Sequence, residues 1–250
     1  MGVERRRVYF ASDVHLGLDL NDPKDRETRF VRFLRSIPPQ ETEALYLLGD
    51  IWDFWYEYRD VVPKGYVRVF AALMDLVDAG VKVTFFIGNH DIWAYGYFES
   101  MGIRVMRAPL QVEHGGVKFC LAHGDGLGPG MLGYKFMNAV FRCRPVQWLF
   151  SLLHPWIAFR LGYGWSRHNR LARGEEYVFG GESEPLYRWA VSYARTHSVD
   201  CFIFGHLHTR VDMHLPSGQR FMVMKDWISS SPYLYFDGTS VREGITINME

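Results

Sequence analysis

Residues 81–91 read "VKVTFFIGNHD". The first seven, rich in Val and Phe, are typical of a β-strand, and the Gly88 that follows them is typical of a turn. An amide, an imidazole and a carboxylate come next without interruption, at Asn89, His90 and Asp91. Because such side chains are rarely left in an apolar core, the stretch predicts a strand whose carboxyl end carries a functional cluster.

The same kind of strand is predicted at several other places along the chain. These runs begin at Val8, Ala44, Val117 and Cys201. Two segments with helical spacing, 26–35 and 66–79, separate the runs at Val8, Ala44 and Val81, which predicts a βαβαβ unit and an α/β fold. After residue 205 short runs follow one another between turn residues such as "PSGQ" and "DGTS", which predicts antiparallel strands.

Four further polar motifs also come directly after strand-type runs: "DVHLG" at 13–17, "GDIWD" at 49–53, "HGD" at 123–125 and "GHLH" at 205–208. In an open α/β sheet the carboxyl ends of the strands meet, and ligands bind there. Taken singly, each motif has a structural interpretation as a turn or a surface residue. Together with "GNHD" they favour one site, whose candidate residues are Asp13, His15, Asp50, Asn89, His123, His206 and His208.

Oxygen and imidazole donors without a thiolate suit Mn²⁺, Fe or Zn²⁺ in a hydrolytic site. Seven such donors are too many for one ion, but they match two ions that share a carboxylate and drive displacement at phosphorus. The three cysteines, Cys120, Cys143 and Cys201, are far apart and form no CxxC pair. This spacing argues against a cysteine metal site and fits a reducing compartment.

Composition limits the other possibilities. With 250 residues, 48% of them hydrophobic, and no evident linker, the chain is expected to form a single domain over 1–250. Residues 127–173, which are aromatic and helical in pattern, are interpreted as an inserted cap. Twenty-eight basic residues balance twenty-eight acidic ones, so no nucleic-acid partner is expected. The longest apolar stretch, 146–159, is too short to cross a bilayer but could lie on a membrane surface.

Two local features concern the substrate. Five aromatic residues follow Asp50 closely: Trp52, Phe54, Trp55, Tyr56 and Tyr58. They exceed what one buried face needs, so some are expected beside the site. The segment 127–173 holds seven Lys and Arg residues and no Asp or Glu. We interpret it as a cap with an apolar interior and a cationic rim, suited to acyl chains on a phosphorylated head group; the alternative is a solvated helical hairpin packed on the body.

The five motifs, in this order over residues 13–208, resemble those of the calcineurin-like metallophosphoesterase family. The resemblance implies two packed mixed β-sheets flanked by helices. It assigns Asp13, His15 and His208 to one divalent ion, Asn89, His123 and His206 to a second, and Asp50 to both, with Mn²⁺ as the expected metal. His90 would then face the phosphate oxygens, and Asp91 would orient His90.

Within that family, "LYLLGDIWDFW" at 45–55, "GYKFMNAVFRCRP" at 133–145 and the position of the cap are similar to UDP-2,3-diacylglucosamine diphosphatases. These are peripheral inner-membrane enzymes of lipid A synthesis. The similarity implies attack of water on the α-phosphorus of a lipid nucleotide and a cytoplasmic location on the inner membrane. It also suggests head-group contacts from the cap residues Arg167, Asn169, Arg170 and Arg173.

One departure keeps an alternative open. The best-known members of that enzyme class have Arg where this chain has His90. A fixed cation suffices when the leaving group is a phosphate, whereas a His that donates a proton helps to expel an alkoxide. The alternative is therefore a phosphomonoesterase or phosphodiesterase that acts on soluble nucleotides or phosphate esters. A non-catalytic scaffold is disfavoured, because all seven candidate ligands are present, and the oligomeric state is left open.

Overall fold

The computed structural model describes residues 6–173 and 177–246, with side chains described for all of these except 169–173. The strands of this part are β1 (Arg7–Ala11), β2 (Thr42–Leu47), β3 (Lys82–Phe86), β4 (Arg104–Met106), β5 (Leu110–His114), β6 (Val117–Ala122), β7 (Cys201–Phe204), β8 (Val211–His214), β9 (Arg220–Val223), β10 (Pro232–Phe236) and β11 (Val241–Ile245). Its helices are α1 (Pro23–Ser36), α2 (Val67–Asp78), α3 (Tyr97–Ser100), α4 (Leu132–Arg142), α5 (Arg144–Ser151), α6 (Pro155–Arg173), a 3₁₀ turn η1 (Gly181–Ser183) and α7 (Pro185–Ala194).

The strands form two mixed sheets. One has the order β11-β10-β1-β2-β3-β4 and the other the order β5-β6-β7-β9-β8. Strands β1, β2 and β3 pair in parallel, with α1 and α2 in the connections, so the predicted βαβαβ unit is confirmed. Strands β6 and β7 are also parallel, and their carboxyl ends lie at neighbouring positions in the second sheet.

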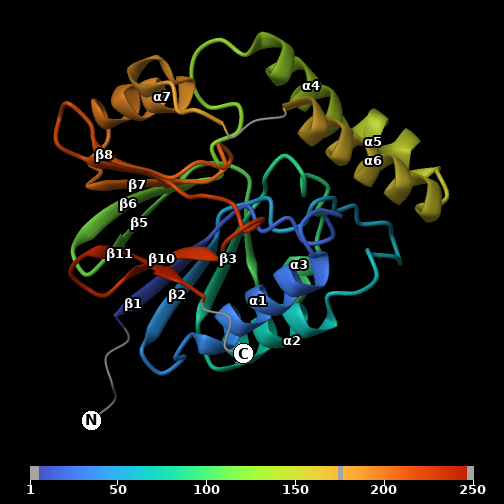
Figure 1. Ribbon diagram of the computed structural model, residues 1–250, viewed down its shortest axis with the longest axis horizontal. Helices are drawn as coiled ribbons and strands as arrows, with labels where there is room; N and C mark the ends of the chain where they lie inside the picture. Colours follow the sequence, from blue (N-terminus) through green and yellow to red (C-terminus); the bar gives the residue numbers. More distant parts are fainter. Residues whose placement is uncertain (1–5, 174–176, 247–250) are drawn as a thin grey trace.

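The sheets and helices stack in four layers (Figure 1). Alternate residues of β1 belong to different cores: Tyr9 and Ala11 pack with α1 and α2, whereas Val8 and Phe10 pack between the two sheets. A third core, which includes Phe202 and Phe204, lies between the second sheet and α7. This alternation is the period-2 pattern of a strand that is buried on both faces. The expected α/β architecture of two packed mixed sheets flanked by helices is thus confirmed.

Local sequence signals place α1 against the first sheet. Asp22 caps the helix by accepting hydrogen bonds from the backbone N–H groups of Lys24 and Asp25, and Pro23 occupies the first helical turn. Phe30 and Phe33 on its inner face are fully buried. The cap at Asp22 and the proline after it therefore set the first residue of the helix. The helix buries the apolar face that its spacing predicts.

The carboxyl-terminal strands agree in part with the prediction of an antiparallel series. Strands β8 and β9 are antiparallel, as are β10 and β11, but β9 also pairs in parallel with β7. Strand β10 returns to the first sheet and lies antiparallel to β1. The predicted antiparallel pairing of successive strands is thus confirmed for β8–β9 and for β10–β11. The parallel pairing of β9 with β7 was not predicted, because turn residues specify a local hairpin, while the partner on the far side of a strand is chosen by packing.

Between β6 and β7 the chain forms the three helices α4, α5 and α6, which lie together at one end of the molecule (Figure 1). No residue of α4 or α5 is buried, and on the described part of α6 only Ala158 and Ser166 are. No helix in the described ranges is long and apolar enough to cross a membrane.

Candidate metal centre

The predicted ligands follow the carboxyl ends of five strands. Asp13 and His15 come after β1, Asp50 after β2, Asn89 after β3, His123 after β6, and His206 and His208 after β7. Because the parallel strands of each sheet end at one edge and the sheets pack face to face, the two edges adjoin. Six of these side chains fall into two compact groups that share Asp50.

The first group consists of Asp13, His15, Asp50 and His208, whose possible ligand atoms lie within 4.8 Å of one another. The Nε2 atoms of His15 and His208 are 3.3 Å apart. The Nε2 atom of His208 lies 3.4 Å from Oδ1 of Asp13, and that of His15 lies 3.9 Å from Oδ2 of Asp50. Two imidazole nitrogens and two carboxylates therefore converge on one point, as a first ion would require.

The second group consists of Asp50, His123 and His206, again with ligand atoms within 4.8 Å of one another. Oδ2 of Asp50 lies 3.3 Å from Nε2 of His123, so this one oxygen faces both groups. Asn89 follows the neighbouring strand β3, and its Oδ1 is buried and has no hydrogen-bond partner among the described residues. A buried amide oxygen without a partner is costly unless an ion or water meets it. The donors present thus fit two divalent ions with a shared carboxylate.

The backbone at the site is unusual in ways that bring these atoms together. Five candidate ligands have positive φ angles between 50° and 70°: Asp13, His15, Asp50, His206 and His208. Non-glycine residues rarely adopt this conformation, and clusters of such residues mark functional sites. Glycine is needed beside them. A Cβ atom on Gly205 would lie 2.3 Å from Oδ2 of Asp13, and one on Gly88 would lie 2.2 Å from Oδ1 of Asp50.

Three groups outside the predicted set hold the imidazole rings. The Nδ1 atom of His15 lies 3.4 Å from Oδ1 of Asp53, and that of His208 lies 3.1 Å from Oδ2 of Asp226. The Nδ1 atom of His123 donates to the carbonyl oxygen of Leu48 at 2.8 Å. His123 and His208 therefore use a hydrogen bond at Nδ1 for orientation, and His15 turns its Nδ1 to the Asp53 carboxylate at ion-pair distance. All three rings turn Nε2 towards the cluster, which is how proteins hold metal-binding histidines.

Two of these residues, Asp53 and Asp226, were not predicted from the sequence as parts of the site. Asp53 lies within the "GDIWD" motif at 49–53, so its position could have identified it as a candidate site residue. Asp226 follows β9, and its contact with His208 depends on the placement of that strand in the sheet. No local pattern around Asp226 would have identified it.

The predicted role of Asp91 is wrong. Its carboxylate accepts hydrogen bonds from the backbone N–H groups of Gly88 at 2.7 Å and Ile51 at 2.9 Å, and so ties the β2 and β3 loops together. The ring of His90 is held instead by the carbonyl oxygen of Asp53, which accepts from Nδ1 at 2.8 Å. Burial, and next the charge of Asp50, raise the pKa of Asp91 to about 8.

The electrostatic centre of the cluster is Asp50. Burial acts against its ionisation, but the neighbouring His123 and His90 outweigh burial and hold its pKa well below the usual range. The backbone N–H of His90 also donates to its Oδ1 at 2.9 Å. Asp50 is therefore a carboxylate whose charge and direction are both determined by its surroundings.

The aromatic run after Asp50 does not line the site. Trp52 and Trp55 are fully buried and belong to the core beneath the first sheet. Phe54, Tyr56 and Tyr58 pack against the cap helices; for example, the hydroxyl groups of Tyr56 and Tyr58 donate to backbone carbonyl oxygens of the cap. The five rings therefore do not act as site residues. Trp52 and Trp55 fill the core, and Phe54, Tyr56 and Tyr58 support the cap helices.

Of the cap residues predicted to contact a head group, Arg167 is exposed on α6. The side chains of Asn169, Arg170 and Arg173 lie outside the described residues. No described contact tests the predicted role of any of the four.

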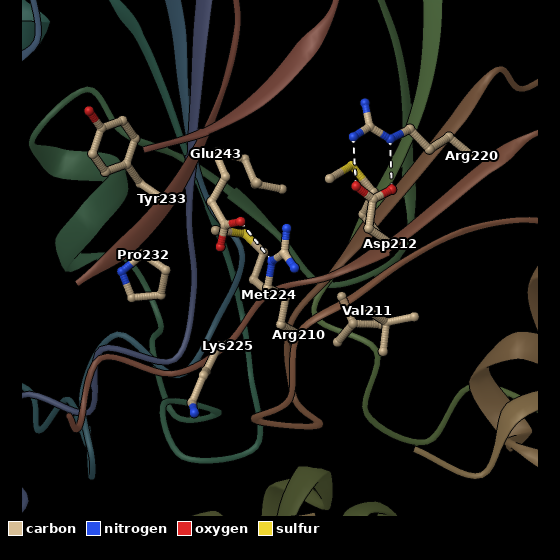
Figure 2. A pocket seen from close by; sticks show the side chains of 12 residues that line it. Arg210, Val211, Asp212, Arg220, Met224, Lys225, Pro232, Tyr233 and Glu243 are labelled. Carbon is tan, nitrogen blue, oxygen red and sulfur yellow. Dashed lines mark hydrogen bonds and ion pairs between the residues drawn. The ribbon is translucent and has the colours of Figure 1, made fainter. Parts of the chain in front are cut away.

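A cavity of about 120 Å³ lies elsewhere, between β8–β9 and β10–β11 (Figure 2). None of the candidate ligands is among the described residues that line it. Two arginines in its wall are already paired, Arg210 with Glu243 at 2.7 Å and Arg220 with Asp212 at 2.8 Å. A third cation, Lys225, also lines the cavity, but no candidate ligand does among the described residues, so the cluster around Asp50 is the better candidate for a metal-dependent site.

Comparisons with known proteins agree with this geometry. The model of the calcineurin-like phosphoesterase family matches residues 6–210. A protein of Porphyromonas gingivalis named UDP-2,3-diacylglucosamine hydrolase is 36% identical over 95% of this chain and 96% of its own length. Proteins with the same name from Stenotrophomonas maltophilia and Neisseria gonorrhoeae are 30% and 28% identical over 91% and 89% of this chain and 94% and 90% of their own lengths.

Among solved structures, a dimetal phosphatase from Danio rerio superimposes with a TM-score of 0.50 at 13% identity, over 98% of this chain and 100% of the other, and so shares the fold. The family match covers most of the chain and includes every candidate ligand. The chain belongs to the calcineurin-like phosphoesterase family and is a metal-dependent hydrolase.

Proposed function

We propose that the protein hydrolyses the diphosphate of UDP-2,3-diacylglucosamine. Water would add to the α-phosphorus, the bond from that phosphorus to the bridging oxygen would break, and the products would be UMP and 2,3-diacylglucosamine 1-phosphate. The names of the relatives at 28–36% identity support this substrate. The observation that carries the proposal is the exposed apolar and cationic surface of α4–α6. Phe54, Tyr56 and Tyr58, which closely follow Asp50 in the chain, connect this surface to the hydrolytic site.

We assign Asp13, His15 and His208 to one ion, Asn89, His123 and His206 to the other, and Asp50 to both. We propose Mn²⁺ as the metal, since these donors suit it and no thiolate is present. When bound, the ions would lower the pKa of water and stabilise charge on the phosphate. The convergence of these side chains and the buried Oδ1 of Asn89 support the assignment.

His90 is proposed to bind the phosphate. Since its Nδ1 donates to the carbonyl of Asp53, its Nε2 is the atom left for the substrate, and this atom lies 4.0 Å from Oδ2 of Asp50. About one fifth of the side chain is exposed, so a ligand can reach it. In the protonated state the ring would donate to a phosphate oxygen and offset charge on the leaving phosphate.

We propose that residues 127–173 act as a cap over the lipid part of the substrate. Ten of the seventeen large apolar side chains that are exposed in the described residues lie between 131 and 165. Eight of the ten are more than half exposed: Leu132, Phe136, Trp148, Leu149, Leu152, Trp156, Leu161 and Trp165. With seven basic residues and no acidic one, the segment suits acyl chains and an anionic head group, to which Arg167, Asn169, Arg170 and Arg173 would contribute.

The same surface supports a peripheral position on the cytoplasmic face of the inner membrane. Interfacial helices gain from apolar burial and from anionic lipid together. Sedimentation with vesicles of anionic phospholipid tests this: we expect binding that weakens as salt rises, and a Trp148→Glu variant should bind less. Equal recovery of wild-type protein and this variant in the supernatant at low salt would contradict it.

A second candidate function is favoured by His90 itself. A His can donate a proton to an alkoxide, so a phosphomonoesterase or phosphodiesterase acting on soluble nucleotides or phosphate esters would use it well. In that case the cap would matter little for turnover.

The decisive experiment is a product assay. Purified protein with Mn²⁺ and detergent is given UDP-2,3-diacylglucosamine, and in parallel p-nitrophenyl phosphate and its bis ester. We expect UMP release that requires Mn²⁺ and is lost in Asp50→Asn. Turnover of the simple esters without UMP release would overturn the substrate assignment and support the second candidate.

A further inference from the structure

One face of α6 carries the small residues Ala158, Gly162 and Ser166, each four positions from the next and therefore in line. Ala158 and Ser166 are the buried residues of the described cap helices, at 0% and 2% exposure. A Cβ atom on Gly162 would lie 2.4 Å from the ring of Phe54. This face is thus the close contact by which α6 lies on the loop after β2.

At the end of this contact, Ser166 reaches the metal centre through one intermediate. Its Oγ donates to Oδ1 of Asp53 at 2.7 Å, and both residues are buried. The same Oδ1 of Asp53 lies 3.4 Å from Nδ1 of His15, and the backbone carbonyl of Asp53 accepts from Nδ1 of His90 at 2.8 Å. One residue of the body therefore links the cap to a proposed ligand and to the proposed phosphate-binding ring.

We propose that Ser166 is a positioning residue that couples docking of the cap to metal binding. With α6 docked, Ser166 holds the carboxylate of Asp53 so that it keeps the Nε2 atom of His15 turned towards the ion. Metal binding must in return favour the docked cap by the same factor, because coupling between two equilibria is reciprocal. The inference rests on the metal site of the proposed function, and it is independent of the lipid substrate.

Other contacts between cap and body lack this consequence. The hydroxyl of Tyr58 donates to the carbonyl of Leu153 at 3.0 Å, and that of Tyr56 to the carbonyl of Gln147 at 2.9 Å. These bonds hold the cap through its backbone. Ser166 differs, because it donates to the Asp53 carboxylate, which lies 3.4 Å from Nδ1 of the proposed ligand His15. Groups that contact a metal ligand in this way tune metal affinity by about 10- to 100-fold.

The test is a titration of the metal-free full-length protein with Mn²⁺, followed by calorimetry. In Ser166→Ala we expect one of the two binding steps, the one that involves His15, to weaken about tenfold, the low end for a group one bond further from the ion. The step that involves His123 and His206 should keep its affinity. Ser166→Cys, which keeps the size of the side chain but has only a weak S–H donor, should recover no more than part of the loss.

Two more variants separate positioning from general packing. Gly162→Ala should weaken the same step, because its new methyl group would meet Phe54 and move α6 away. Ser151→Ala is the matched control within the cap. The hydroxyl of Ser151 bonds the Trp148 carbonyl of its own helix and the side chain of Tyr56, and neither partner has a described contact with a candidate ligand, so its Mn²⁺ affinities should equal those of wild type.

Hydrogen exchange gives the reciprocal measurement. Mn²⁺ should slow amide exchange along α6 in wild-type protein, and this protection should shrink by the same factor in Ser166→Ala. Wild-type affinity for both ions in Ser166→Ala, or an equal loss in Ser151→Ala, would overturn the proposal. Failure of wild-type protein to bind Mn²⁺ would overturn the metal assignment, and failure to release UMP would overturn only the substrate.

Discussion

The body and the cap of this protein treat their apolar side chains in opposite ways. Helix α1 of the body buries residues such as Phe30 and Phe33 completely. Helices α4 and α5 of the cap bury none, and α4 leaves Phe136 73% exposed. A helix that exposes large apolar residues gains little from its own fold and is shaped for contact with something else. The body therefore buries its apolar side chains for stability, and the cap leaves an apolar surface that the proposed lipid substrate would cover.

The largest expected effect tests whether chemistry belongs to the body alone. Asp50→Asn should lower kcat/KM for every phosphoester by about 10³-fold or more, because metal-based charge stabilisation is worth several kcal/mol. Steady-state kinetics with p-nitrophenyl phosphate measures this. Asp212→Asn, which changes a carboxylate at the edge of the second sheet, should keep wild-type activity; a similar loss in both variants would break the distinction.

The same substitution in the two regions should have very different effects on stability. Phe33→Ala is expected to lower the free energy of unfolding by about 3–5 kcal/mol, because it leaves a cavity in the body core. Phe136→Ala should change it by less than about 0.5 kcal/mol, as for an exposed site. Urea unfolding followed by fluorescence provides both values. A loss above 2 kcal/mol, on the same scale, for Phe136→Ala would show that the cap buries this ring after all.

The third prediction concerns His90, the residue of the body that is expected to meet the substrate. His90→Ala should lower kcat/KM by about 10²-fold, since the ring would no longer offset charge on the phosphate. His90→Arg should keep most activity on a diphosphate, for which a fixed cation suffices, and lose activity on esters with alkoxide leaving groups. Equal kinetics of the Arg variant on both classes would contradict this division of roles.

The smallest effect should distinguish substrates rather than abolish turnover. Trp148→Glu on α5 is expected to lower the ratio of kcat/KM for the lipid nucleotide to that for p-nitrophenyl phosphate by about tenfold, because burying one large apolar side chain is worth roughly 1.5–3 kcal/mol. Val67→Glu is the matched control, since Val67 is 75% exposed on a body helix. An unchanged ratio for Trp148→Glu would remove the cap from lipid recognition.

Much of the fold could be predicted because its signals are local. Strands such as β3 show their period and composition within a few residues, and α1 shows its cap at Asp22. The parallel order of β1, β2 and β3 follows from the helices that separate them. Strand β9 could not be placed in this way, because its pairing with β7 depends on a neighbour from another part of the chain.

In the candidate site, too, the features with local sequence signals were predicted and those that depend on tertiary contacts were not. The ligand candidates were predicted because each lies directly after a strand, and parallel strands end together. The roles of Asp91 and of the aromatic run from Trp52 to Tyr58 were not, since a sequence motif names side chains without saying what each one faces. Asp91 turned out to hold backbone N–H groups, and the aromatic rings to fill the core and support the cap.

The sequence by itself determined which residue types are available for chemistry and at which strand ends they occur, because strand period, turns and motif spacing act over a few residues. Only the tertiary structure decided how those residues are oriented. Asp226 meets His208 across 18 positions, and Ser166 meets Asp53 across 113. Such contacts arise when separate layers pack together, and the packing of layers is a property of the whole chain.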